Sequence, residues 1–285
     1  MDNDQLPLAD TEVHYLESSR VGEEFKIFVG HCPGGGAEPP GVLYLTDANG
    51  MFGMAVDVIR GMQLYAHLPP LLVVGIGYRA GGLAGTLAAR TRDLTPSEYH
   101  DFAALVPDQS VMGGADHLLA FIRTELMSWV GSHYPIDPDH ATYFGHSFGG
   151  LFGTWVLLNE PETFQRYAIG SPSLWWDEGV VFRRGEEYAR VHDDLPAKVF
   201  FGIGADETHE GRIREAANLP ADQREVAAVV PFDMVADLQR LVALLEAPGY
   251  PGLAMRHAVL PEEFHVTVAP LVLSRGLRYL YDAPT

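Results

Sequence analysis

The chain has 285 residues, of which 47% are hydrophobic and 20% are charged, so its composition is that of a globular protein and not of a disordered or fibrous one. Its 38 acidic residues outnumber the 19 basic ones and give a formal net charge of −19 at pH 7. Such a charge repels polyanions, which argues against a nucleic-acid partner.

The single cysteine and the lengths of the apolar runs indicate the compartment. Cys32 has no second thiol with which to form an internal disulfide, so a reducing environment fits best. The first residues lack the basic-then-apolar pattern of a signal peptide, and no apolar run approaches the roughly 18 residues of a membrane span. We therefore expect a cytoplasmic protein that makes no contact with a membrane.

In chain order, the first predicted elements are β-rich segments at 12–16 and 23–29, which indicate an antiparallel hairpin. Short apolar runs without alternation follow, as is typical of parallel strands covered on both faces. They lie at residues 42–45, 71–74, 141–144, 167–169, 199–201 and 255–259. Between them, apolar residues recur at helical spacing in 116–130 and 235–245. The pattern predicts a single α/β domain over residues 1–285, with a mostly parallel central sheet and helices on both faces.

The sharpest motif is Gly-His-Ser-Phe-Gly-Gly at residues 145–150, between the apolar run 141–144 and a helical segment. A serine on a tight strand-to-helix turn needs small neighbours two residues before and two after it, which is the physical basis of the G-x-S-x-G pattern. The turn lifts the hydroxyl out of the sheet. We therefore predict that Ser147 is a nucleophile and that His146, beside it, is structural.

A serine hydroxyl is a weak nucleophile until a base removes its proton, and after a turn of this type the acid and then the histidine follow along the chain. The run 199–201 leads into a loop with two neighbouring carboxylates. Asp206 is the preferred orienting acid, Glu207 is the alternative, and Glu210 remains open. His265 is the predicted base because it lies on a loop, which can reach over the sheet edge.

An acyl-transfer site also needs donors for the oxyanion. One predicted donor is the backbone N–H of Phe148, directly after the nucleophile. The other is expected in the loop after residues 42–45, where the N–H of Asn49 is preferred and that of Ala48 is the alternative.

These motifs resemble those of the "Putative esterase" family of the α/β-hydrolase superfamily. The matching stretches are residues 43–47, 90–96, 145–150, 171–176 and 264–265, together with 273–277. The chain looks closest to the siderophore trilactone esterases of the enterochelin type. The resemblance implies an α/β-hydrolase fold and a serine carboxylic-ester hydrolase that forms an acyl-enzyme on a siderophore-like or another aryl or acyl ester.

The same resemblance, together with side-chain chemistry, suggests residues that bind the small-molecule substrate. Trp175 and Trp176 offer aromatic surface, although either is equally well a core residue. Arg90 and Arg92 offer positive charge for an acidic group, although a loop salt bridge explains them as well. Phe264 accompanies the predicted base.

Other chemistry finds little support in the sequence. The glycines at 75–77 lack the helix start that a dinucleotide needs, so no nucleotide cofactor is expected. Residues 137–140 and 192–194 match neither a calcium loop nor a zinc helix, so no metal is expected. Amidase, peptidase or acyltransferase activity on the same residues stays open, as does a non-catalytic binding protein. A homodimer is the common default.

Overall fold

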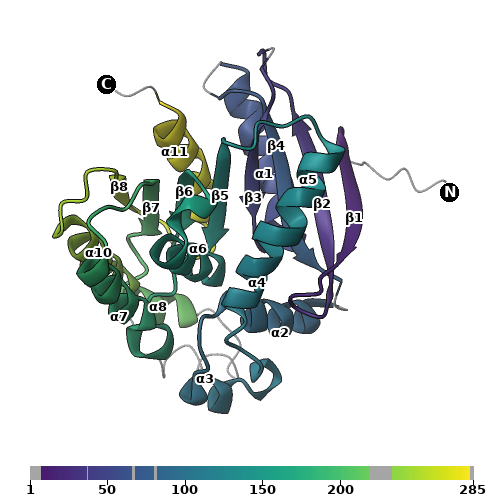
Figure 1. Ribbon diagram of the computed structural model, residues 1–285. Coiled ribbons are helices and arrows are strands. Elements are labelled where there is room, and N and C mark those ends of the chain that lie inside the picture. The colour runs from purple at the N-terminus through teal and green to yellow at the C-terminus, as the bar shows by residue number, and fades with distance from the viewer. Residues whose placement is uncertain (1–7, 37, 66–67, 80–81, 218–232, 283–285) are drawn as a thin grey trace.

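The apolar runs of the sequence form the strands of an eight-stranded sheet (Figure 1). The computed structural model describes residues 8–36, 38–65, 68–79, 82–217 and 233–282. The strands are β1 (Thr11–Glu17), β2 (Glu24–Cys32), β3 (Gly41–Leu45), β4 (Leu71–Tyr78), β5 (Ala141–His146), β6 (Arg166–Gly170), β7 (Lys198–Gly204) and β8 (Ala254–Leu260). Their order across the sheet is β1-β2-β4-β3-β5-β6-β7-β8.

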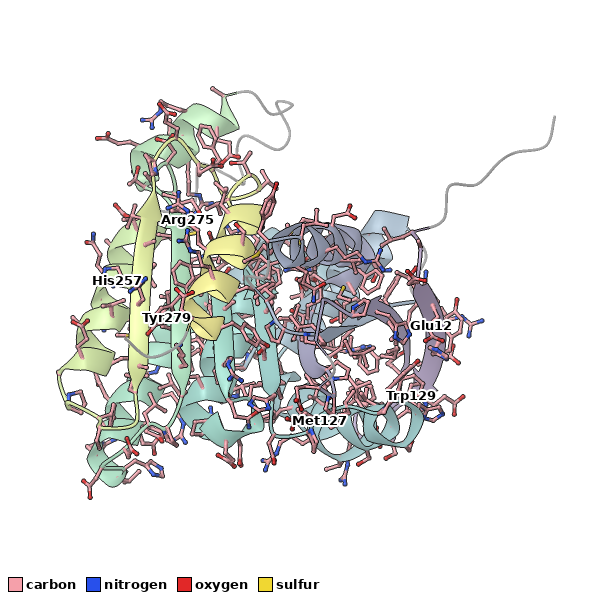
Figure 2. All side chains as sticks on the ribbon, turned by 90° about the horizontal axis from the view of Figure 1, so that it is seen from above. Glu12, Met127, Trp129, His257, Arg275 and Tyr279 are labelled. Carbon is pink, nitrogen blue, oxygen red and sulfur yellow. The ribbon has the colours of Figure 1, made fainter. Side chains whose placement is uncertain are left out.

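The directions of the strands confirm the predicted hairpin and the mostly parallel sheet. β1 pairs antiparallel with β2, and β2 pairs antiparallel with β4. The remaining neighbours are parallel. All residues of β3, β4 and β5 are buried, which explains why these runs show no polar alternation. Glu12 on β1 and His257 on β8 lie at opposite ends of the sheet (Figure 2).

Helices cover both faces of this sheet, as predicted. They are α1 (Ala48–Gln63), α2 (Gly82–Leu94), α3 (His100–Leu105), α4 (Ala115–Phe121), α5 (Met127–His133), α6 (Phe148–Asn159), α7 (Trp176–Val191), α8 (His209–Ala216), α10 (Met234–Glu246) and α11 (Ala269–Tyr281). Short helical turns are η1 (Pro107–Gln109), η2 (Ile122–Leu126) and η3 (Pro161–Thr163). The helix predicted over 116–130 is present as α4 and α5, joined by the π-helical turn η2.

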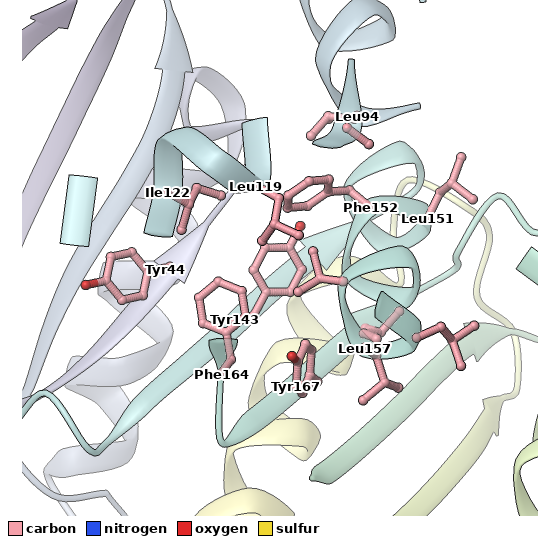
Figure 3. Close-up of a cluster of buried hydrophobic side chains, with 14 of the residues drawn as sticks. Tyr44, Leu94, Leu119, Ile122, Tyr143, Leu151, Phe152, Leu157, Phe164 and Tyr167 are labelled. Carbon is pink, nitrogen blue, oxygen red and sulfur yellow. The ribbon is translucent and has the colours of Figure 1, made fainter. Parts of the chain in front are cut away.

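Each face of the sheet has its own hydrophobic core. On one face α1 and α11 pack over the central strands, with residues such as Val56 and Val272 fully buried. On the other face α2, α4, α6, α7 and α10 enclose a larger cluster. Figure 3 shows part of this second cluster, where Tyr143, Phe164 and Tyr167 on the sheet side meet Leu119 and Phe152 from α4 and α6. The rigid two-sided packing holds the ends of the strands in place.

The carboxyl ends of the parallel strands meet at one edge of the sheet, where open α/β sheets bind their ligands. Ser147 follows β5 directly, Glu207 lies just after β7, and His265 lies just after β8. The fold thus brings three segments that are far apart in the sequence to one place. In the described part of the chain, no helix combines the length and apolar character needed to cross a bilayer.

Candidate active site

Ser147 occupies a strained turn between β5 and α6. Its backbone angles are φ 61° and ψ −118°, in a region that residues other than glycine rarely adopt. Its backbone N–H donates to the carbonyl of Gly170 at 3.0 Å, which ties the turn to the end of β6. This contact with the neighbouring strand helps to keep Ser147 in its strained backbone conformation.

The glycines around the serine are required by close approaches. A Cβ on Gly145 would lie 2.3 Å from the carbonyl oxygen of Gly149, and one on Gly149 would lie 2.4 Å from Oγ1 of Thr46. Neither position has room for a side chain. Gly149 also brings the end of β3 against the start of α6, so the segments of both predicted oxyanion donors are neighbours.

Three side chains form a continuous hydrogen-bonded array at this edge. Oγ of Ser147 lies 2.9 Å from Nε2 of His265, and Nδ1 of His265 lies 2.7 Å from Oε2 of Glu207. The carboxylate can accept only the Nδ1 proton, so Nε2 is free to accept the serine proton. The structure therefore brings Ser147 and His265 together, as the sequence predicts.

The carboxylate beside the imidazole belongs to Glu207, and the preference for Asp206 is wrong. The carboxylate of Asp206 instead pairs with Arg214 of α8 at 2.7 Å, in a partly exposed position. The reason lies in the loop backbone, because the Asp206 N–H donates to the carbonyl of Glu263 at 3.2 Å. This bond joins the loops after β7 and β8 and leaves the next side chain, Glu207, to reach inward. Glu210 is exposed on α8.

Glu207 is 2% exposed, and its second oxygen is fully engaged. Oε1 accepts hydrogen bonds from the Ser171 hydroxyl at 2.6 Å and from the Gly204 N–H at 2.8 Å. Ser171 is buried and has a positive φ of 39°. These two donors fix the carboxylate so that Oε2 faces His265. Sequence reasoning missed Ser171, although it begins the Ser-Pro-Ser stretch directly after β6.

The predicted oxyanion donors lie at the starts of two helices. Phe148 is the first residue of α6, and Asn49 is the second residue of α1, after Ala48. The first N–H groups of a helix have no partner within the helix, so they are free to face a ligand. The Asn49 side chain bonds both the N–H and the carbonyl of Tyr78, at 2.7 and 2.9 Å, and thereby attaches the start of α1 to the end of β4.

Arg90 does not belong to the lining of the serine's cavity, contrary to the expectation of a substrate contact. Its guanidinium binds both carboxylate oxygens of Asp47, at 2.8 and 2.9 Å. It also lies over the Phe148 ring, 4.9 Å from the centroid. Asp47 precedes α1 and Phe148 begins α6. Arg90 therefore connects the two segments that carry the predicted oxyanion donors.

Arg92 lies away from Ser147, so its predicted role in substrate binding is corrected. Its guanidinium binds the buried Asp93 at 2.7 and 2.9 Å and Glu23 at 2.8 Å, and it lines a separate hollow beside β2 and β4. Burial raises the pKa of Asp93, and Arg92 works against that rise. The salt-bridge alternative left open by the sequence is the one that the structure shows.

We expect Arg92→Met to lower stability and to leave ester turnover unchanged. The change leaves the Asp93 carboxylate buried without its counter-ion, which costs about 2 to 3 kcal/mol in the free energy of unfolding. Urea denaturation measures this loss. Arg123→Met, which removes a half-exposed pair with Glu160, is the matched control and costs at most about 1 kcal/mol. A change in KM above about threefold for Arg92→Met would show instead that this side chain contacts substrate.

A cavity of about 390 Å³ opens above Ser147 and His265. Phe102, Phe148 and Trp175 give it an aromatic wall. The other described residues that line it are Ser173, Glu207, Arg212, Glu215, Met234 and Val266. Such a mostly apolar pocket with a few polar groups is typical of a small-molecule site.

Two further residues that the sequence suggested do not line this cavity. Trp176 is fully buried, and its indole N–H donates to the carbonyl of Ser97 at 3.1 Å. It packs edge-on against Phe148 and so supports the aromatic wall from behind. Phe264 is half-buried, and its backbone accepts from Thr267 and Val268 where the chain turns into α11. Of the two tryptophans, only Trp175 faces the cavity.

Arg212 and Glu215 enter the cavity from α8, in a polar segment for which the sequence suggested no role. Burial lowers the pKa of Arg212, while Glu215 and Glu207 work in the opposite direction. A cation in the wall stands out in a chain with a net charge of −19. The polar stretch of the sequence that contains α8 runs from residue 208 to residue 224, and its part from residue 218 lies outside the described residues. Among the described residues, no three His, Cys, Asp or Glu side chains gather in a way that suits a metal ion.

Comparisons with known proteins find relatives among the esterases. A family model described as "Putative esterase" matches residues 18–230. The chain is 29% identical over 283 residues to the ferri-bacillibactin esterase BesA of Bacillus subtilis, with 94% of this chain and 89% of that protein covered. It is 27% identical over 294 residues to the siderophore triacetylfusarinine C esterase of Aspergillus fumigatus, with 97% and 95% covered.

A solved structure shows the same likeness over the whole length. The siderophore hydrolase EstB from Aspergillus nidulans matches with a TM-score of 0.80 at 26% identity, and the match covers 99% of this chain and 98% of that one. Together with the strand order, this confirms the predicted α/β-hydrolase fold. The resemblance to enterochelin-type esterases is confirmed as well.

Proposed function

Because this chain belongs to the "Putative esterase" family and is an esterase, we propose that it cleaves its ester through an acyl-enzyme on Ser147. The observation that carries this proposal is the hydrogen-bonded array of Ser147, His265 and Glu207. All three residues line the cavity that has the aromatic wall. Such an array supplies a nucleophile, a base and an orienting acid within hydrogen-bond reach of one another.

In the acylation half of the reaction, Oγ of Ser147 attacks the ester carbonyl carbon while Nε2 of His265 takes the hydroxyl proton. The imidazolium that forms donates Nδ1–H to Glu207, whose negative charge stabilises it. The bond between the carbonyl carbon and the alcohol oxygen then breaks. His265 returns the proton to the departing alcohol, and the acyl group remains on Ser147.

In the second half, water takes the place of the alcohol. His265 removes a proton from water as the water oxygen attacks the acyl carbon, and Ser147 leaves as the protonated hydroxyl. The product is a free carboxylic acid. In both halves the oxyanion is stabilised by the Phe148 N–H and, as predicted from the sequence, by an N–H at the start of α1, that of Asn49 or Ala48.

We propose a siderophore-type ester as the substrate. The relatives described above are named as esterases of ferri-bacillibactin and triacetylfusarinine C. In this chain, Phe102, Phe148 and Trp175 offer surface for an aryl or acyl arm, and Arg212 offers positive charge. A cavity of about 390 Å³ suits one arm with its ester, while the rest of a large macrocycle would stay outside.

Hydrolysis of a substrate panel tests both parts of the proposal. The panel contains p-nitrophenyl butyrate, a catecholate trilactone and a hydroxamate ester siderophore, the last two with and without Fe³⁺. The anilide of butyric acid is the matched amide. Protein pretreated with a fluorophosphonate is the blank, and mass spectrometry locates the label, which we expect on Ser147.

We expect turnover of the esters and none of the anilide. Turnover of the anilide at a comparable rate would support an amidase instead. Turnover of the simple ester alone would overturn the siderophore part and leave the esterase part standing. If the folded protein hydrolysed no ester, the proposed activity would be wrong.

A further inference from the structure

His146 is a buried titratable residue that the proposed mechanism does not use. It ends β5 and directly precedes Ser147, and it is only 6% exposed. Both ring nitrogens are shielded from solvent, and the polar group that interacts with the ring is the backbone of His265. A buried imidazole that interacts with the predicted base requires an explanation beyond the filling of space.

The His146 ring lies between the end of β6 and the imidazole of His265. Its centroid is 4.7 Å from that of His265, with 42° between the ring planes. The backbone of Gly170 is so close to the ring that a Cβ there would lie 2.8 Å from Nδ1 of His146. Gly170 in turn accepts the N–H of Ser147. The ring is therefore in close contact both with the end of β6 and with the predicted base.

We propose that His146 is a positioning residue for the base: its ring contacts the imidazole of His265 and opposes any turn of that imidazole away from Ser147 and Glu207. This inference rests on the proposed function, because it assigns a role toward the base of that same site. It differs from a purely structural role, since it concerns the orientation of His265 and not the stability of β5.

The hydrogen bonds of His265 fix the positions of its two nitrogens. One joins Nε2 to Oγ of Ser147 and the other joins Nδ1 to Oε2 of Glu207. A turn of the ring about the line through these nitrogens would point the N–H and the lone pair away from their partners and weaken both bonds. The His265 side chain is 33% exposed and lies on a loop, so the groups that pack against it lie on its buried side. The His146 ring, with its centroid 4.7 Å from that of His265, opposes such a turn.

The charge state of His146 is compatible with this role. Burial holds its pKa well below the ordinary value for histidine, and the positive charge that His265 can carry lowers it further. The ring is therefore neutral at neutral pH. When His265 becomes an imidazolium during turnover, the neighbouring ring adds no like charge beneath it.

Substitution of His146 by Ala, Leu and Phe tests the proposal. Phe keeps a flat ring, Leu fills space without one, and Ala does neither. The matched control is His257→Ala on the outer strand β8, where the side chain is exposed (Figure 2). Thermal unfolding reports stability, kcat and KM are measured with p-nitrophenyl butyrate, and the rate of phosphonylation of Ser147 by a fluorophosphonate reports its activation.

We expect kcat to fall about 50-fold in His146→Ala and about tenfold in His146→Leu, because a small misplacement of a catalytic group costs up to about 10²-fold. KM stays within about threefold, and phosphonylation slows in parallel with kcat. His146→Phe restores both rates to within about fivefold of the parent, and His257→Ala has no effect. If the Ala variant does not fold, the comparison of Phe with Leu decides.

Two results would overturn the proposal. In the first, a folded His146→Ala protein keeps the parent kcat. In the second, Leu and Phe give equal rates, which would mean that the ring only fills space. Failure of the proposed function is distinguishable, because it is the parent protein that then hydrolyses no ester. The phosphonylation rates of Ser147 still compare the variants in that case.

Discussion

Glu207→Gln is expected to lower kcat for ester hydrolysis by about 10⁴-fold, while Asp206→Asn leaves it within about threefold of the parent. The amide of glutamine has nearly the shape of the carboxylate but carries no charge. It can turn its NH₂ group toward Nδ1 of His265, which favours the wrong tautomer and leaves Nε2 unable to accept the serine proton. It also gives no charge stabilisation to the imidazolium. Asp206, by contrast, pairs with Arg214 in a partly exposed position.

The two variants are matched, since each replaces one acid by its amide in neighbouring positions of one loop. Steady-state kinetics on p-nitrophenyl butyrate measures the effect, with Ser147→Ala as the background rate. Circular dichroism and thermal unfolding confirm that both variants are folded. A silent Glu207→Gln together with an inactive Asp206→Asn would contradict the geometry and restore the preference that the sequence suggested.

The second large effect is expected for Arg90→Met, which we predict to lower kcat by about 10²-fold to 10³-fold. Arg90 holds Asp47 with two hydrogen bonds and lies over the Phe148 ring, so it connects the starts of α1 and α6. Without it the two predicted oxyanion donors lose their common support. Loss of one such donor costs about 10² to 10³ in kcat in other serine hydrolases. Methionine keeps much of the apolar stem, so the wall of the cavity changes little.

The kinetic pattern separates this role from the one that the sequence suggested. A supporting residue acts in the transition state, so kcat falls and KM changes little. A substrate contact would mainly raise KM, and that result would contradict our interpretation. Arg90→Lys, which cannot form the two-point contact with Asp47, is expected to lie between the parent and the Met variant. Arg92→Met, two positions further along the chain, is the control, and we expect its kcat to equal that of the parent.

The sequence was sufficient where a local pattern required one backbone conformation. The glycines around Ser147 are set by contacts shorter than any side chain allows, so the turn is readable without a structure. His265 is readable because it is a loop histidine placed directly after the last predicted strand. The order of strands and helices likewise follows from apolar runs that alternate with helical patterns.

The sequence was insufficient where two neighbouring residues have similar chemistry, because it does not show which of the two side chains faces the site. Trp175 faces the cavity and Trp176 enters the core, although both follow the same strand. Asp206 and Glu207 differ in the same way. Successive side chains point in different directions, and which one points inward depends on the path of the loop. That path is set by a bond to Glu263, from another loop, which no local pattern reveals.

Residues contributed by distant segments were missed for a related reason. Phe102 on α3 and Met234 at the start of α10 reach the cavity only through tertiary packing. Phe102 opens a short apolar run, residues 102–106, which shows no difference from a core segment in the sequence. Ser171 lies in a stretch that carries the family resemblance, residues 171–176, but nothing there shows that its hydroxyl binds a carboxylate, because that partner comes from another loop.

The hydrogen bond between the N–H of Met234 and the carbonyl of Glu207, at 3.1 Å, closes a long excursion of the chain at its base. The chain leaves the sheet at Gly204, contributes Arg212 and Glu215 of α8 to the cavity, and comes back beside Glu207 at Met234, the first residue of α10. One residue, Glu207, thus supplies the side-chain oxygen for His265 and the backbone carbonyl for the start of α10. A displacement of α10 would therefore be passed directly to the group that orients the base.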